Sequence, residues 1–139
     1  QDFYVIRYAE VLLMRAEALV ESGSYDEGEV DNLIDQVRAR VNMPSVESVE
    51  GTGLSATNLT NLIRHERRVE TAFEGLRFFD LKRWGNYEAE AVDKYMAYDK
   101  PLAPAIQNRL NIGAKHALFP IPQRELDVNR ALVQASEWK

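Results

Sequence analysis

The sequence has 139 residues, with 17 Lys and Arg against 22 Asp and Glu, for a formal net charge of −5 at pH 7. At roughly 150 residues per domain, this length predicts one domain, and the acidic balance disfavours nucleic-acid binding. The sequence has no cysteine for disulfides, thiol nucleophiles or metals, and no run of about 18 apolar residues that could span a bilayer. It begins at Gln1 without a basic-then-apolar leader, which indicates a fragment or a processed chain.

Residues 1–42 are expected to form a helical hairpin. Gly23 is suited to end the first helix, and the second is predicted from about Asp26 to about Asn42, before Met43-Pro44. Apolar residues at helical spacing define the two stripes: Val5, Ala9, Leu12, Ala16 and Leu19 in the first, and Val30, Leu33, Ile34, Val37 and Val41 in the second. The hairpin is close in length to one tetratricopeptide unit, but no second copy follows, so a repeat array is not indicated.

Residues 43–56 show no helical period and are expected to form a loop. Ser55 or Thr57 is suited to cap the following helix. Asn58-Leu59-Thr60 matches the glycosylation sequon, but a match this short is weak, and a role at the helix entry is favoured.

Residues 57–85 are expected to form one helix or a pair of helices divided at Gly75, with Gly85 as the stop. The predicted apolar line consists of Leu62, Val69, Phe73 and Leu76. At about 100° per residue, Glu66 falls inside this line, as do Arg77 and Asp80 if the helix continues. Three further arginines are expected to point away from the line: Arg64, Arg67 and Arg68.

Residues 86–139 are expected to form a loop-rich tail. Phe119-Pro120-Ile121-Pro122 must be extended, because proline fixes its own φ and restricts its predecessor. Gln123-Arg124-Glu125-Leu126 is suited to open one short helix. The predicted fold is therefore all-α, with tetratricopeptide-like hairpins, long loops and an extended, turn-rich C-terminal segment.

The carboxylates Glu66, Glu70 and Glu74 recur at i, i+4 and i+8. Glu66 and Glu70 would have Cβ atoms about 6 Å apart, which leaves a glycosidase-type pair open, whereas Asp80 would lie about 21 Å from Glu66 on a straight helix. A buried Glu66 requires a cationic partner, because an unpaired buried charge is costly. We therefore favour a structural ion network over catalysis and predict that Glu66 is buried and paired with one of Arg7, Arg15 and Arg38.

The two histidines, His65 and His116, lack the spacing of zinc or di-iron ligands. His65 is expected on an exposed helix face. No nucleophile elbow and no phosphate-binding glycine loop is present in the sequence. We expect no metal, no cofactor and no catalytic residue.

Four aromatic residues cluster within ten positions: Phe78, Phe79, Trp84 and Tyr87. Exposed aromatic faces can stack on sugar rings, so a carbohydrate platform is one hypothesis. Packing inside the fold is favoured for Phe78, Phe79 and Trp84. Tyr87, beyond the predicted helix end, is the best candidate for an exposed ring.

Three blocks in order carry a resemblance to a known family. The first block is Ile6–Leu13 with Ala16–Leu19, followed by Val37–Arg40 and Met43-Pro44. The second block is Ile63–Glu70 with Phe73–Gly75, Arg77, Asp80-Leu81 and Arg83–Gly85. The third block is Pro120–Leu126 with Asn129, Leu132 and Gln134. With these blocks the chain resembles the C-terminal part of the SusD/RagB family of outer-membrane nutrient-binding lipoproteins. It departs from the family pattern after Gln134, where Ala135–Trp138 replaces the usual Gln-Asn-Pro-Gly-aromatic ending.

The resemblance implies a SusD-like helical scaffold that binds oligosaccharides or other nutrients without enzymatic activity. It implies delivery to a SusC-like TonB-dependent transporter at the outer surface of the outer membrane. The family's lipid anchor is attached to a cysteine near the N-terminus, which this chain lacks, and its sugar-binding residues lie mostly upstream of these blocks. No ligand-binding residue is therefore assigned from the resemblance.

Two alternatives remain. One is a tetratricopeptide-like protein-interaction module without sugar binding, and the other is a hydrolase that uses Glu66 and Glu70. Exposed aromatic residues in a polar cleft would favour sugar binding, and a broad helix face would favour a protein partner. Two carboxylates open to one cleft, one with a raised pKa, would favour the hydrolase.

Overall fold

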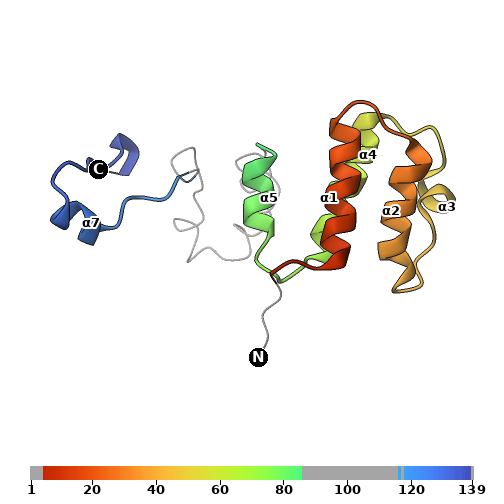
Figure 1. Cartoon of the computed structure of the whole chain (residues 1–139), viewed down its shortest axis with the longest axis horizontal. Helices are drawn as coiled ribbons and strands as arrows, with labels where there is room; N and C mark the ends of the chain where they lie inside the picture. The colour runs from red at the N-terminus through yellow and green to blue at the C-terminus, as the bar shows by residue number, and fades with distance from the viewer. Residues whose placement is uncertain (1–4, 86–115, 117, 139) are drawn as a thin grey trace, which may run out of the picture. The chain divides into compact units, whose positions relative to one another are not determined.

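The computed structural model describes residues 5–85, 116 and 118–138, and every regular element in these ranges is a helix (Figure 1). The predicted all-α fold is therefore confirmed. The chain divides into two compact units, residues 1–77 and 78–139. Among the described residues, the buried side chains of the main hydrophobic core come from residues 12–63, all in the first unit.

The first unit begins with the expected helical hairpin. Helix α1 (Tyr8–Glu21) is followed by Gly23 at φ 72°, a left-handed conformation that glycine adopts readily. Helix α2 (Glu27–Ala39) is capped by Asp26, whose side chain accepts a hydrogen bond of 2.9 Å from the Glu29 N–H. The two helices lie side by side (Figure 1). Val5 and Val41, assigned to the two stripes, instead lie outside the helices and are exposed.

Helix α3 (Val46–Glu50) lies within the segment expected to be a loop. The Ser45 hydroxyl caps its first turn by accepting from the Ser48 N–H, and the Asp35 carboxylate accepts from the Val46 N–H at 2.8 Å. Five residues are too few to show a helical period in the sequence. The expectation of a loop throughout 43–56 was therefore wrong at these residues.

Helix α4 (Ala56–Glu70) contacts both α1 and α2 (Figure 1). Of the two predicted caps, Ser55 is the one used, and its hydroxyl accepts from the Asn58 N–H at 3.2 Å. The largest fully buried side chains of the core are Leu13, Val30, Ile34, Val46, Leu59 and Ile63. Each contributes about 1.5–3 kcal/mol by leaving water, so these contacts between α1, α2, α3 and α4 hold the unit together.

The predicted apolar line of the third helical run is wrong beyond Leu62. Val69 is 58% exposed, and Phe73 is fully exposed. Helix α4 ends at Glu70, and the N–H and the hydroxyl of Thr71 both donate to the Arg67 carbonyl in its last turn, at 3.0 Å and 2.7 Å. Phe73 and Gly75 then have positive φ values of 65° and 79°, so the residues beyond Thr71 leave the helical register.

The rest of the described chain contains the expected break, at Gly75 near the end of the first unit, and the expected short helix in the second unit. Helix α5 (Arg77–Arg83) starts after Gly75, as the predicted division requires. Helix α7 (Gln123–Val128) begins at the predicted Gln123, and η4 (Ser136–Trp138) is one 3₁₀ turn near the C-terminus. Expectations for residues 86–115, including Tyr87, lie outside the described residues.

The segment after α7 is tied back to the proline-rich stretch. The Ile121 N–H donates to Gln134 Oε1 at 3.1 Å, and Gln134 Nε2 donates to the Ile121 carbonyl at 3.0 Å. The Trp138 indole donates to the Leu118 carbonyl at 3.2 Å. An extended segment cannot form hydrogen bonds within its own backbone, so the side-chain amide of Gln134 pairs with the backbone N–H and C=O of Ile121 instead.

Candidate functional site

The first candidate feature is a set of buried ion pairs around α4. Arg38 and Glu66 are both buried, and Arg38 Nε and Nη2 donate to Glu66 Oε1 at 3.0 Å and 2.6 Å. The prediction of a buried Glu66 paired with arginine is therefore confirmed, with Arg38 as the partner. Arg15, another of the proposed partners, instead pairs with Glu29 at the surface.

A second buried pair was missed. Arg67 was expected to point away from the packed face, but it is only 5% exposed and donates to Glu10 at 3.2 Å. The expectation was wrong because α4 is covered on two sides, by α1 and by α2. Glu66 reaches Arg38 of α2, and the next residue, Arg67, reaches Glu10 of α1.

The carboxylate of Glu70 is held by two arginines. Arg7 and Arg40 donate to its two oxygens at 2.8 Å and 3.0 Å, and Arg7 also binds Glu74. Burial by itself raises the pKa of Glu70, but the hydrogen bonds from Arg7 and Arg40 outweigh it and hold the pKa below its ordinary value.

These contacts disfavour the glycosidase hypothesis. A general acid requires a raised pKa and access to substrate. Glu66 is buried against Arg38, and the pKa of Glu70 moves in the opposite direction. The network accordingly acts as scaffold, and it fixes the ends of α1, α2 and α4 relative to one another.

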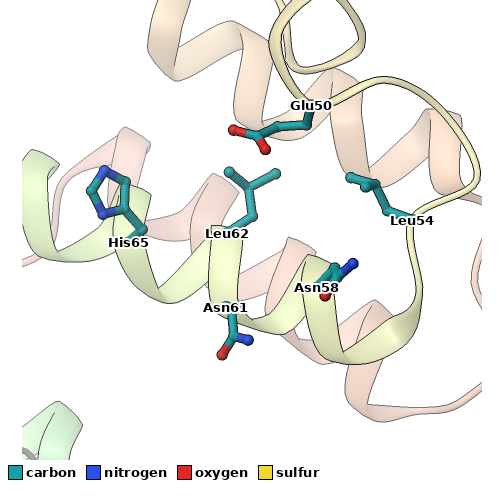
Figure 2. Close-up of a pocket in the computed structure, with 6 residues that line it drawn as sticks. All are labelled: Glu50, Leu54, Asn58, Asn61, Leu62 and His65. Carbon is teal, nitrogen blue, oxygen red and sulfur yellow. The ribbon is translucent and has the colours of Figure 1, made fainter.

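A groove of about 560 Å³ lies along the outer face of α4. It is lined by Glu50, Leu54, Asn58, Asn61, Leu62 and His65 (Figure 2). The four residues from α4 recur at i, i+3, i+4 and i+7, which places them on one helix face. Glu50, at the end of α3, and Leu54, in the following loop, form the opposite wall (Figure 2). The volume falls in the range of about 300–1,000 Å³ typical of small-molecule sites.

The loop wall of this groove is fixed by α2. Glu27, in the first turn of α2, accepts hydrogen bonds from the Gly53 and Leu54 N–H groups at 3.1 Å and 2.8 Å. Gly51 and Gly53 both have positive φ, which glycine tolerates. The groove is therefore held in shape by a carboxylate that lies outside it.

Sequence reasoning placed His65 correctly on an exposed face but assigned no role to its neighbours. The spacing of Asn58, Asn61 and His65 was the available signal, because it marks one polar helix face. Within the described ranges, no group of three or more potential metal-ligating side chains is present.

A second cavity, of about 520 Å³, lies beside the ion network. It is lined by the start of α1, the end of α2 and Glu70. Its charged residues, Arg7, Arg40 and Glu70, already bind one another. This cavity is thus less suited to a polar ligand than the groove along α4.

The aromatic cluster lies in the second unit. Phe78 contacts Phe79 edge-on at 5.4 Å and Phe119 at 5.7 Å between ring centroids, with Lys82 over the rings of Phe78 and Phe119. Phe78 and Trp84 are half-buried, in agreement with packing. Phe79 is 65% exposed, so the packing interpretation was wrong for most of its surface.

None of the described helices is long and apolar enough to cross a membrane.

A helical hairpin joined to a third long helix by buried arginine–carboxylate pairs defines a tetratricopeptide-like helical scaffold, with a polar groove on one helix face.

The comparisons with known proteins identify the family. The model of the SusD family matches residues 1–138, and the chain belongs to that family. SusD-like protein P25 of Formosa agariphila is 32% identical over 94% of the chain and 23% of its own length. SusD-like protein P2 of the same organism is 39% identical over 59% of the chain and 17% of its own length.

The chain thus spans about a fifth of the length of the curated relatives it matches. No solved structure gives a significant match.

Proposed function

We propose that the chain is part of a glycan-binding protein that captures oligosaccharides and passes them to a SusC-like TonB-dependent transporter. The observation that carries this proposal is the SusD family match over residues 1–138. The proposed role is binding without catalysis, and the arginine-bound state of Glu66 and Glu70 supports it. We place the full-length parent at the outer surface of the outer membrane, held there by a lipid anchor.

The experiment is a calorimetric titration of a glycan panel against this chain and against a version extended at its N-terminus toward the length of the relatives. Binding by the extended protein is expected. Failure of both proteins to bind any member of the panel, together with failure of the extended protein to co-purify with its transporter, would refute the proposal.

A protein-interaction role is the second candidate, and one observation favours it. Tyr8, Val11 and Met14 form an exposed apolar strip on α1, with exposures of 72%, 45% and 38%. Such a strip on a helix face is typical of a protein contact. Changing Val11 to Glu should abolish co-purification with the transporter, leaving glycan binding unchanged, if this strip is the contact.

A further inference from the structure

We propose that the groove along α4 binds a neutral, hydroxyl-rich saccharide segment. This inference rests on the proposed glycan-binding function and names the ligand class and the residues of one site within it. The carrying observation is a groove lined by four polar side chains, Glu50, Asn58, Asn61 and His65, together with the apolar side chains of Leu54 and Leu62.

The groove has the dimensions of a binding site for a short chain. Asn58 and His65 mark its ends on α4, seven residues apart, which corresponds to about 10 Å along the helix axis. Glu50 projects over Leu62 from the opposite wall (Figure 2). A ligand that follows α4 would therefore meet polar groups on both sides.

The side chains that line the groove are available to a ligand. Asn58, Asn61, His65 and Glu50 are all exposed. Within the part of the chain that the structure describes, no hydrogen bond or ion pair engages these four side chains, and the Asn58 N–H that binds Ser55 belongs to the backbone. These side chains can therefore form hydrogen bonds with a ligand.

The chemistry of the lining selects the ligand class. Each carboxamide offers a donor and an acceptor, the imidazole offers one of each when neutral, and the carboxylate only accepts. This mixture suits hydroxyl groups, which also donate and accept. The faces of Leu54 and Leu62 suit the C–H surface of a sugar ring.

Charge determines which saccharides fit. Among the lining residues that the structure describes, only Glu50 carries a formal charge at neutral pH, and it is negative. The chain as a whole carries a net charge of −5. An anionic saccharide would therefore meet repulsion with no arginine or lysine of the lining to offset it.

The site is also pre-organised. Glu27 holds the Gly53 and Leu54 backbone from α2, and Ser55 caps α4 at the same end of the groove. Leu62 is buried in the core on its inner side. A ligand thus binds without ordering the walls, which reduces the entropic cost of binding.

The test is an NMR titration of the 139-residue chain with laminarihexaose, xylohexaose, mannohexaose and maltohexaose, and with hexagalacturonate as the acidic probe. At least one neutral oligosaccharide should shift the amide signals of residues 50–65, and hexagalacturonate should not. The double change Asn58→Ala and Asn61→Ala should weaken binding by about tenfold, because it removes two hydrogen-bonding side chains.

The double variant is expected to fold, since both asparagines are exposed and alanine favours helix. Asn32→Ala provides the matched control, because it removes an exposed amide from α2, away from the groove. It should bind as the unchanged chain does.

The outcomes separate this inference from the proposed function. If the chain binds a neutral oligosaccharide equally well with the double change, the groove is not the site, whereas the proposed function stands. If only the N-terminally extended protein binds, the same conclusion holds. If hexagalacturonate alone binds, the ligand class is wrong. If neither protein binds any glycan, this inference fails, and the proposed function fails as well if the extended protein also does not co-purify with its transporter.

Discussion

Loss of one partner of the Arg38–Glu66 pair should remove a large share of the stability of the first unit. Both side chains are at most 8% exposed, and two hydrogen bonds join the guanidinium to one carboxylate oxygen. Replacing Arg38 by Ala leaves the Glu66 carboxylate buried without its cation. A broken buried pair costs about 3–5 kcal/mol.

The size of this effect can be compared with the stability of the unit. At about 0.05–0.15 kcal/mol per residue, the 77 residues of the first unit give roughly 4–11 kcal/mol in total. Arg38→Ala should therefore remove a large share of the unfolding free energy. The double change Arg38→Met and Glu66→Leu, which leaves no charge behind, should cost much less than either single loss.

The assay is urea denaturation followed by circular dichroism, with a double-mutant cycle over the two positions. Arg15→Ala is the control, since Arg15 and Glu29 also join α1 to α2 but are 63% and 41% exposed. That change should cost less than about 1 kcal/mol. If Arg38→Ala costs no more than Arg15→Ala, the claim that burial makes the Arg38–Glu66 pair essential is refuted.

Three further predictions concern single side chains. Asp31 Oδ1 is buried with no hydrogen-bond partner in the described structure, and the pKa of Asp31 is raised first by burial and then by the nearby charges of Glu27 and Asp35. Ionised Asp31 therefore destabilises the fold at neutral pH. Asp31→Asn should raise the free energy of unfolding by about 0.5–1 kcal/mol after solvent screening, measured by urea denaturation at pH 7. Burial raises the pKa of Glu70, but the hydrogen bonds from Arg7 and Arg40 lower it by more, so the net pKa lies below its ordinary value. The stability that ionised Glu70 contributes is therefore present above the ordinary Glu pKa of about 4.3 and is lost as the pH falls below it. Glu70→Gln should remove this contribution and so flatten the fall of the unfolding free energy at acid pH. Gln134→Ala should remove both hydrogen bonds to Ile121 and speed exchange of the Ile121 amide, with no change for Gln123→Ala.

Helical periodicity was a sufficient guide to most of the buried residues of α1 and α2. The stripes of α1 and α2 and the caps at Asp26 and Ser55 follow from local sequence, because each requires only neighbours within one turn. Periodicity also placed Glu66 on the packed face, and the cost of burying a lone charge predicted its arginine.

Arg67 shows where this reasoning fails. A single stripe assumes that a helix has one packed face, but α4 contacts both α1 and α2 and so buries two adjacent residues, Glu66 and Arg67. The prediction that Phe73 lies on the packed face is wrong because α4 ends before this residue, so the helical spacing no longer applies to it. The Arg67 error follows from a tertiary contact that no local pattern encodes, and the Phe73 error follows from the position at which the helix ends.

The groove was missed for a different physical reason. Its α4 face is visible as a polar spacing in the sequence, but its second wall depends on Glu27 binding the backbone of Gly53 and Leu54, 26 and 27 residues away. Without that contact, the loop before α4 would lose the two hydrogen bonds that join its backbone to α2, and the wall that carries Glu50 and Leu54 would be less firmly held. The same carboxylate therefore links the scaffold to the proposed site. Glu27→Gln should weaken oligosaccharide binding even though Glu27 does not line the groove, whereas unchanged binding would show that the loop holds its position without it.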